Sequence, residues 1–203
     1  MLFNTLPDIR TGADLTMTII YRMFNLGVFD KCVNMRINID GASDNVNYTS
    51  VKAFCHLLVS AEKMRWPLRK ITTMRQRVNH TKNHVDQCWS SLSRIVYGVG
   101  NRGQSRRDVL DWTQLKHCAQ LAFKNRLLCF EEIKGCYDFD EFVREYRPTR
   151  VEKGIRKQMV LEYHVQDGVV SMRSKEFLDP RCPWSKSVQI FPDLSTPTFS
   201  PHA

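Results

Sequence analysis

Apolar and polar residues alternate strictly between residues 33 and 39, and few local patterns restrict a fold more. A period of two predicts a β-strand, which places Asp40 at its carboxyl end. The next apolar pattern, over residues 51–59, has helical spacing, and residues 69–78 then predict a second strand. Two strands joined through a helix favour a parallel pair with a right-handed crossover. The sequence therefore predicts an α/β fold.

Helical patterns flank these two strands. Residues 13–26 repeat apolar side chains at helical spacing and end before Gly27, which stops the helix. A second amphipathic stripe predicts a helix with one buried face, formed by Val85, Cys88, Trp89, Leu92, Ile95 and Val96. From Ala13 to Tyr97 the expected order is therefore helix, strand, helix, strand, helix.

Further signals mark the ends and edges of these elements. Thr49 or Ser50 can cap the helix between the strands, and Trp66-Pro67 ends it. The second strand carries Arg75 and Arg77, which suit the edge of a sheet better than its middle.

The remaining chain predicts more helices and a hairpin. Residues 109–124 and 139–146 have helical patterns. Residues 158–165 and 169–172 flank Gln166-Asp167-Gly168, which predicts a β-hairpin within a basic segment. The proline-rich tail from Asp179 is expected to be irregular.

Charge and cysteine usage indicate the kind of partner and compartment. A net charge of +9 and a pI near 9.3 favour a polyanionic partner, nucleic acid first. The seven cysteines are odd in number and form no C-x-x-C pair, which favours free thiols and an intracellular location, nuclear if the protein handles DNA. No signal-peptide core or membrane-length apolar run occurs, so no membrane partner is expected.

Acidic side chains follow the strand patterns. Asp40 ends the first strand, Asp44 lies in the next turn, and Asp86 lies in the first turn of the helix after the second strand. Asp40 and Asp86 can approach one another at the carboxyl edge of a parallel sheet, where open α/β sheets place their sites. Such carboxylates could hold Mg²⁺ or Mn²⁺ for phosphodiester chemistry, while His80 orients phosphate or water.

Each of these residues also has a structural interpretation. Asp40-Gly41 and Ser43-Asp44-Asn45 are good turn sequences, and Asp44 or Asn47 can simply cap a helix. The helix dipole favours Asp86 in a first turn without any metal. His80 and His84 are four residues apart and could form a zinc pair with a distant cysteine, or serve only as hydrogen-bonding groups.

A run of basic residues flanks the acidic positions. Its members are Arg69, Lys70, Arg75, Arg77 and Lys82. Such a run can contact the phosphates of a nucleic acid, or it can be a solvated face without a ligand.

The acidic turn after the first strand and the start of the last helix resemble an uncharacterised domain family found in transposon-derived proteins. Its members carry a D-N-x-N turn and then a V-G-H-T-x-x-x-[IV]-D-Q-x-[FW]-S signature. The turn is matched by Asp44, Asn45 and Asn47, and the signature by Val78, His80, Thr81, Val85, Asp86, Gln87, Trp89 and Ser90. Asn79 replaces the glycine, and Lys82 replaces a frequent histidine. The resemblance covers residues 12–125.

This family in turn looks like the ribonuclease-H-like core of DDE transposases, which runs three antiparallel strands, helix, strand, helix, strand, helix. The resemblance implies that Asp40 or Asp44 is the second catalytic acid and Asp86 the third. Residues 1–12 are too short to supply the first three strands or the first acid. The chain is therefore expected to be a truncated product, a domesticated remnant, or a chain whose C-terminal hairpin substitutes for the lost strands.

The expected organisation follows from this resemblance. We expect a lead-in over residues 1–12, a partial ribonuclease-H-like core over residues 13–125, a helix and basic β-hairpin over residues 126–178, and an irregular tail over residues 179–203. The expected function is nucleic-acid binding, with catalytic ability degenerate. The alternatives are an interaction module without metal or nucleic acid, whose charge serves solubility, and a zinc-stabilised module.

Overall fold

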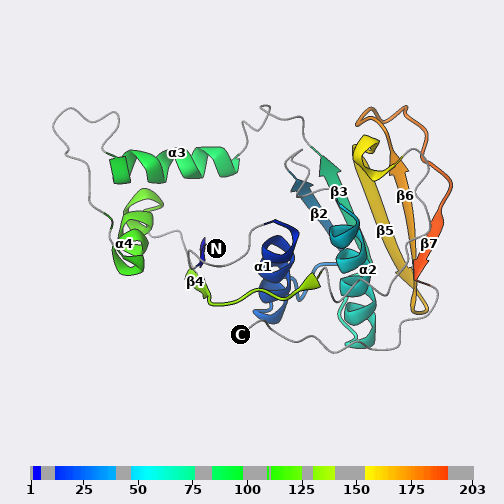
Figure 1. Ribbon diagram of the computed structural model, residues 1–203, viewed down its shortest axis with the longest axis horizontal. Coiled ribbons are helices and arrows are strands. Elements are labelled where there is room, and N and C mark those ends of the chain that lie inside the picture. Colours follow the sequence, from blue (N-terminus) through cyan, green and yellow to red (C-terminus); the bar gives the residue numbers. More distant parts are fainter. Residues whose placement is uncertain are drawn as a thin grey trace. The chain divides into compact units, whose positions relative to one another are not determined.

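A computed structural model describes residues 2–5, 12–39, 47–75, 84–97, 109, 111–124, 130–139 and 154–191 (Figure 1). The chain divides into two compact units. The smaller unit contains Met1–Asp8 and His80–Lys134, and the larger contains Ile9–Asn79 and Gly135–Ala203. In the larger unit, segments that are distant in sequence therefore form one core.

A five-stranded mixed sheet forms the centre of the larger unit, in the order β2-β3-β5-β6-β7. Its strands are β2 (Asn34–Ile39), β3 (Lys70–Arg75), β5 (Val160–Gln166), β6 (Val169–Lys175) and β7 (Val188–Phe191). Strands β2 and β3 are parallel, and every other neighbouring pair is antiparallel. The α/β fold and the predicted parallel pair are confirmed.

Helix α2 (Tyr48–Lys63) connects the two parallel strands, as the sequence predicts. The Asn47 side chain caps this helix by accepting a hydrogen bond from the Ser50 backbone N–H at 2.8 Å. The cap is therefore Asn47 rather than Thr49 or Ser50. Helix α1 (Ala13–Asn25) also forms as predicted, and both helices cover one face of the sheet (Figure 1).

The main core lies between these helices and the sheet. On β5 the alternate residues Leu161, Tyr163 and Val165 belong to it, and Tyr163 is completely buried. The Tyr163 ring lies 5.9 Å from the Phe54 ring of α2, measured between centroids. The short 3-10 helix η1 (Ile155–Lys157) leads into β5 and adds Ile155 to the core. Residues from the C-terminal third thus complete a core that begins at α1.

Strand β3 lies inside the sheet, so the prediction that it forms an edge is wrong. It pairs with β2 on one side and with β5 on the other. Arg75 is the last residue of the strand, where a long cationic side chain disturbs the sheet least, and Arg77 lies outside the described residues. Arg75 misled the prediction because it marks the end of the strand rather than a free edge.

The predicted hairpin is confirmed as β5 and β6. Its two turn residues, Asp167 and Gly168, both have positive φ angles of 52° and 77°. This backbone conformation is that of the tight turn whose twist matches the twist of paired strands. The Gly168 N–H also donates a hydrogen bond to Glu62 Oε2 at 2.7 Å, which fastens the turn to the end of α2.

The tail is more regular than predicted. Strand β7 falls within residues 179–203 and pairs antiparallel with β6, with an irregularity at Val170 and Ser171. Ile190 of this strand is only 4% exposed and belongs to the main core. The alternation of apolar residues over 188–190 is too short to indicate a strand within a proline-rich tail. The expectation of an irregular tail is therefore wrong for residues 188–191.

The smaller unit contains α3 (His84–Tyr97), α4 (Trp112–Ala122) and the parallel strands β1 (Leu2–Thr5) and β4 (Phe130–Ile133). Both helices were predicted, whereas neither β1 nor β4 was. Its buried core residues are Leu92 of α3 and Cys118 and Ala119 of α4. Of the helix predicted over residues 139–146, only Phe139 is described.

Trp89 does not join this core, although the sequence pattern predicts that it does. Its side chain is 55% exposed. The α3 residues that pack toward α4 are Leu92, Ile95 and Val96, so the buried stripe is shorter than the apolar stripe. The prediction of a buried Trp89 is wrong because periodicity identifies a face of the helix but not the length that a neighbour covers.

The described cysteines are free thiols: Cys32, Cys55, Cys118, Cys136 and Cys182. Cys55 and Cys118 are buried in helices, as expected of thiols that act as small apolar side chains. Within the described ranges, no helix combines the length and apolarity that a membrane crossing needs.

The hairpin turn provides a test of this fold. A Cβ added at Gly168 meets no atom within 4 Å, so Gly168→Ala should act only through its positive φ. We expect a loss of about 1 kcal/mol in the free energy of unfolding, measured by urea denaturation. Asp167→Asn is the control and should leave stability unchanged, since Asn tolerates this conformation. Equal stability of Gly168→Ala and wild type would contradict the assigned turn.

Candidate nucleic-acid interface

The face of the sheet opposite α1 and α2, here called the outer face, carries a cluster of charged side chains. Because Leu161, Tyr163 and Val165 point into the core, the alternate residues Glu162 and His164 project to this other face. The register then aligns one row across four strands, formed by Arg36, Thr72, Glu162 and Arg173. Asn34, Lys70, His164 and Ser171 form the next row.

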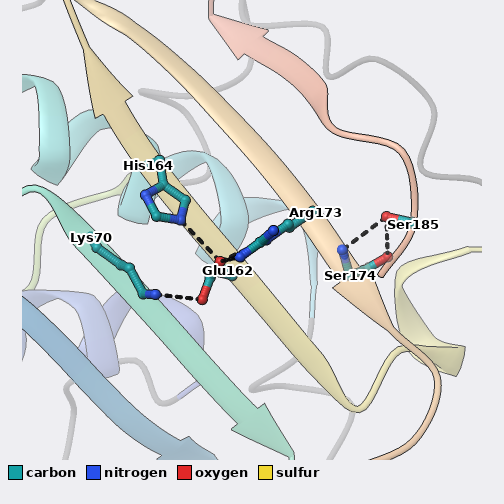
Figure 2. A network of polar contacts seen from close by, with 6 residues as sticks. All are labelled: Lys70, Glu162, His164, Arg173, Ser174 and Ser185. Carbon is teal, nitrogen blue, oxygen red and sulfur yellow. Dashed lines mark hydrogen bonds and ion pairs between the residues drawn. The ribbon is translucent and has the colours of Figure 1, made fainter. Parts of the chain in front are cut away.

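Glu162 is the centre of the cluster (Figure 2). Its Oε2 lies 2.7 Å from Lys70 Nζ. Its Oε1 lies 2.9 Å from His164 Nε2 and 2.7 Å from Arg173 Nε. The Glu162 side chain is only 6% exposed, whereas those of Lys70 and Arg173 are 29% and 40% exposed. One buried carboxylate therefore fixes three partly accessible basic side chains.

These contacts determine the protonation of Glu162. Burial by itself raises the pKa of the carboxyl group, but hydrogen bonds from Lys70, His164 and Arg173 outweigh that effect and lower the pKa to about 2. Glu162 is therefore an anion at neutral pH and holds its cationic neighbours in place.

The outer face nevertheless remains basic. Cationic residues occupy strand positions on this face at Arg36, Lys70, Arg173 and Lys175, around the carboxylate of Glu162. Arg36 is exposed. Arg36 and Arg173 lie in one row, on β2 and β6 with β3 and β5 between them, whereas Lys70 and Lys175 lie in other rows. The cations are therefore spread over this face, where they can contact several phosphates of a polyanion.

An aromatic ring adjoins the cations. Trp184 lies in the connection between β6 and β7, and the Arg173 guanidinium carbon is 4.4 Å from the centroid of its ring. Lys175 Nζ is 4.7 Å from the same ring. These are cation–π contacts, which place a flat apolar surface next to the basic side chains of the outer face.

The basic residues predicted from the sequence do not share one face. Lys70 belongs to the outer face. Arg69 precedes β3, and its guanidinium donates hydrogen bonds to the backbone oxygens of Trp66 and Leu68 at 2.5 and 2.9 Å. Arg75 lies toward the helix side and lines a cavity of about 10 Å³. The structure thus separates Lys70 from Arg75, because an odd offset along a strand reverses the face, and Arg69 lies before the strand.

Most of the predicted acidic site lies outside the described residues. This is true of Asp40, Asp44 and His80, and of the basic residues Arg77 and Lys82. Ile39 pairs with Arg75, so Asp40 follows the carboxyl end of the parallel pair.

Asp86 is the third residue of α3, in the smaller unit, and His84 is the first. In the parts of the chain that the structure describes, no group of three or more His, Cys, Asp or Glu residues could hold a metal ion.

Several residues of the outer face were not singled out from the sequence, namely Arg36, Glu162, His164, Arg173, Lys175 and Trp184. A signal existed, since polar side chains alternate with apolar ones in both β2 and β5. That signal gives the face of each strand but not its neighbours. Only the pairing of β3 with β5 brings Lys70 to Glu162.

Comparison of the chain with protein-family models, curated proteins and solved structures finds no match. The expected resemblance to transposon-derived proteins therefore stays a prediction from the motif residues. A function must be inferred from the chemistry of the side chains, and those of the outer face provide the best-defined arrangement.

The central carboxylate provides a pH-dependent test. Glu162→Gln leaves Lys70 and Arg173 without their counter-charge, and should lower the free energy of unfolding at pH 7 by on the order of 2 kcal/mol. Because the folded pKa lies below that of an unfolded glutamate, the stabilisation is present above about pH 4.5 and is lost as pH falls toward 2. Urea denaturation at several pH values measures this.

Glu132→Gln is a matched control, since Glu132 is 33% exposed and its 3.8 Å pair with Lys134 is open to solvent screening. It should change stability little at any pH. A wild-type to Glu162→Gln difference that stayed constant between pH 7 and pH 3 would contradict the network.

Proposed function

We propose that this chain is a transposase-derived domain that binds nucleic acid through the outer face of its sheet, with DNA as the expected partner. The observation that carries the proposal is the pair of cations, Lys70 and Arg173, that the buried Glu162 carboxylate holds on this face. Cations that neutralise phosphates release condensed counterions, which drives binding. The net charge of +9 adds a favourable long-range attraction.

The geometry of the cluster favours binding in a second way. Lys70 and Arg173 are long side chains that would lose much conformational entropy on contacting a ligand. Glu162 already restrains both, at 2.7 Å from Lys70 Nζ and 2.7 Å from Arg173 Nε. Their partly exposed N–H groups can still donate to phosphate. Preorganisation of this kind reduces the cost of binding.

We further propose that the chain contains a partial ribonuclease-H-like core over residues 13–125. Its support is the order α1, β2, α2, β3 with a parallel β2–β3 pair. The C-terminal hairpin adds antiparallel strands beside β3, in line with the idea that it replaces strands of such a core. In this proposal Asp40 and Asp86 would be the acids that match a transposase, with Asp44 as the substitute for Asp40.

The proposed function is binding without cleavage. Two-metal phosphodiester chemistry requires several converging carboxylates, and the resemblance assigns two of its three acids to this chain. If a centre did form, Asp40 and Asp86 would hold Mg²⁺ or Mn²⁺, and His80 would orient phosphate or water. The competing function is a protein-interaction module whose basic charge serves only solubility.

The salt dependence of DNA binding distinguishes the proposed function from a protein-interaction module. We expect the chain to bind a fluorescent DNA oligonucleotide with an affinity that falls steeply as salt increases, measured by anisotropy. The double variant Arg36→Ala/Lys175→Ala should weaken binding and reduce the slope of log K against log salt by about 1 for each phosphate that is no longer neutralised.

The matched control is Lys31→Ala/Lys63→Ala, which removes the same charge outside the outer face. It should change the slope little. Absence of DNA binding at low salt by well-folded protein would overturn the proposed function, and equal slopes in the two double variants would reject the outer face as the interface.

Catalysis is tested separately. We expect labelled DNA to remain uncut when the protein is incubated with Mg²⁺ or Mn²⁺, because the matched acids are too few for a two-metal clamp. Gel analysis of wild type, Asp40→Ala and Asp86→Ala decides the matter. Cleavage by wild type that is lost in both variants would instead show a working metal centre.

A further inference from the structure

A hollow adjoins the outer face at Trp184. It has a volume of about 660 Å³ and is formed by the segment from Ser174 to Ser185, with Gln158 as a further lining residue. Trp184 and Phe177 supply aromatic walls, while Ser174 and Glu176 supply polar groups. Sites for small organic groups occupy roughly 300–1,000 Å³ and combine these features. The hollow is therefore large enough for a nucleobase.

Trp184 connects the hollow to the basic side chains of the outer face. Its ring lines the hollow and also contacts Arg173 and Lys175 of the outer face. A strand of nucleic acid whose phosphates follow the cations would therefore have its bases within reach of an aromatic surface. The Phe177 side chain, 60% exposed, offers a second such surface in the same segment.

Hydrogen bonds hold this segment in place before any ligand arrives. Ser185 Oγ accepts from the Ser174 N–H at 2.9 Å and lies 3.1 Å from Ser174 Oγ (Figure 2). The Ser185 N–H donates to the Ser174 backbone oxygen at 2.8 Å. Arg181 pairs with Asp179 at 2.8 Å further along the segment. Trp184 is thus fixed beside β6 next to Ser185.

We propose that the nucleic acid bound by the outer face is single-stranded, with one base entering the hollow and stacking on Trp184. This inference rests on the proposed function and specifies its ligand. Single strands are bound by a basic groove together with aromatic side chains that stack with bases. In a duplex the bases are already stacked and paired, so none can enter the hollow without costly extrusion.

The experiment compares an oligothymidine with a duplex of equal length, by anisotropy at several salt concentrations. Wild type should bind the single strand more tightly. Trp184→Ala should weaken single-strand binding on the order of 10-fold, whereas Trp184→Phe should retain most of it because a phenyl ring still stacks. Trp89→Ala, which removes an exposed tryptophan from α3, should bind as wild type does.

A stacking role has a signature that a merely structural one lacks. Stacking releases no counterions, so Trp184→Ala should lower the affinity without changing the slope of log K against log salt. Duplex binding should be unaffected by the substitution. If Trp184→Ala does not fold, judged by its thermal unfolding, crosslinking of wild type to an oligonucleotide containing 5-iodouracil gives the second readout, with crosslinks expected in residues 174–185.

The outcomes distinguish this inference from the proposed function. Duplex binding that equals or exceeds single-strand binding, unchanged single-strand affinity in Trp184→Ala, or crosslinks only outside residues 174–185 would overturn the base-stacking site while nucleic-acid binding stands. Failure of folded wild-type protein to bind either oligonucleotide would overturn both.

Discussion

The antiparallel pairing of β3 with β5 is the interaction on which the larger unit depends. It joins the parallel pair from the first half of the chain to the hairpin from the last third, with Ile71 opposite Tyr163 and Lys70 opposite His164. The ladder continues beyond β3, since the Val165 N–H donates to the Arg69 backbone oxygen at 3.1 Å. Both the core and the outer face depend on this pairing, because the core lies on one face of the paired strands and the charged cluster lies on the other.

Burial of Glu162 links stability to recognition. A buried carboxylate is tolerated only when hydrogen-bonded cations surround it. Lys70 and Arg173 meet that requirement from opposite neighbouring strands, and in doing so they become restrained donors on a basic surface. Trp184 extends the same arrangement, because Arg173 contacts both the carboxylate and the indole ring. The proposed nucleic-acid interface is therefore built from the interactions that stabilise the sheet.

Periodicity predicted the elements better than their surroundings. Strand β2, helix α2, the start of α3 and the Asp167-Gly168 turn follow from patterns a few residues long. Errors arose where a neighbour decides the outcome. Trp89 has the spacing of a buried residue but is exposed, and the arginine-bearing β3 is an inner strand. Of the candidate site, Lys70 was identified, while Glu162, Arg173 and Trp184 were not.

The sequence by itself determined the four helices, strands β2 and β3, and the β5–β6 hairpin, because these features depend on neighbours within about one turn or one hairpin. It did not reveal β1, β4 or β7. The tertiary structure alone decided that β5 pairs with β3 and that β7 extends the sheet. Strand pairing depends on residues far apart in sequence, here Lys70 and Glu162, and alternation within a strand gives no information about its partner. The contact of Lys70 with Glu162 follows from that pairing.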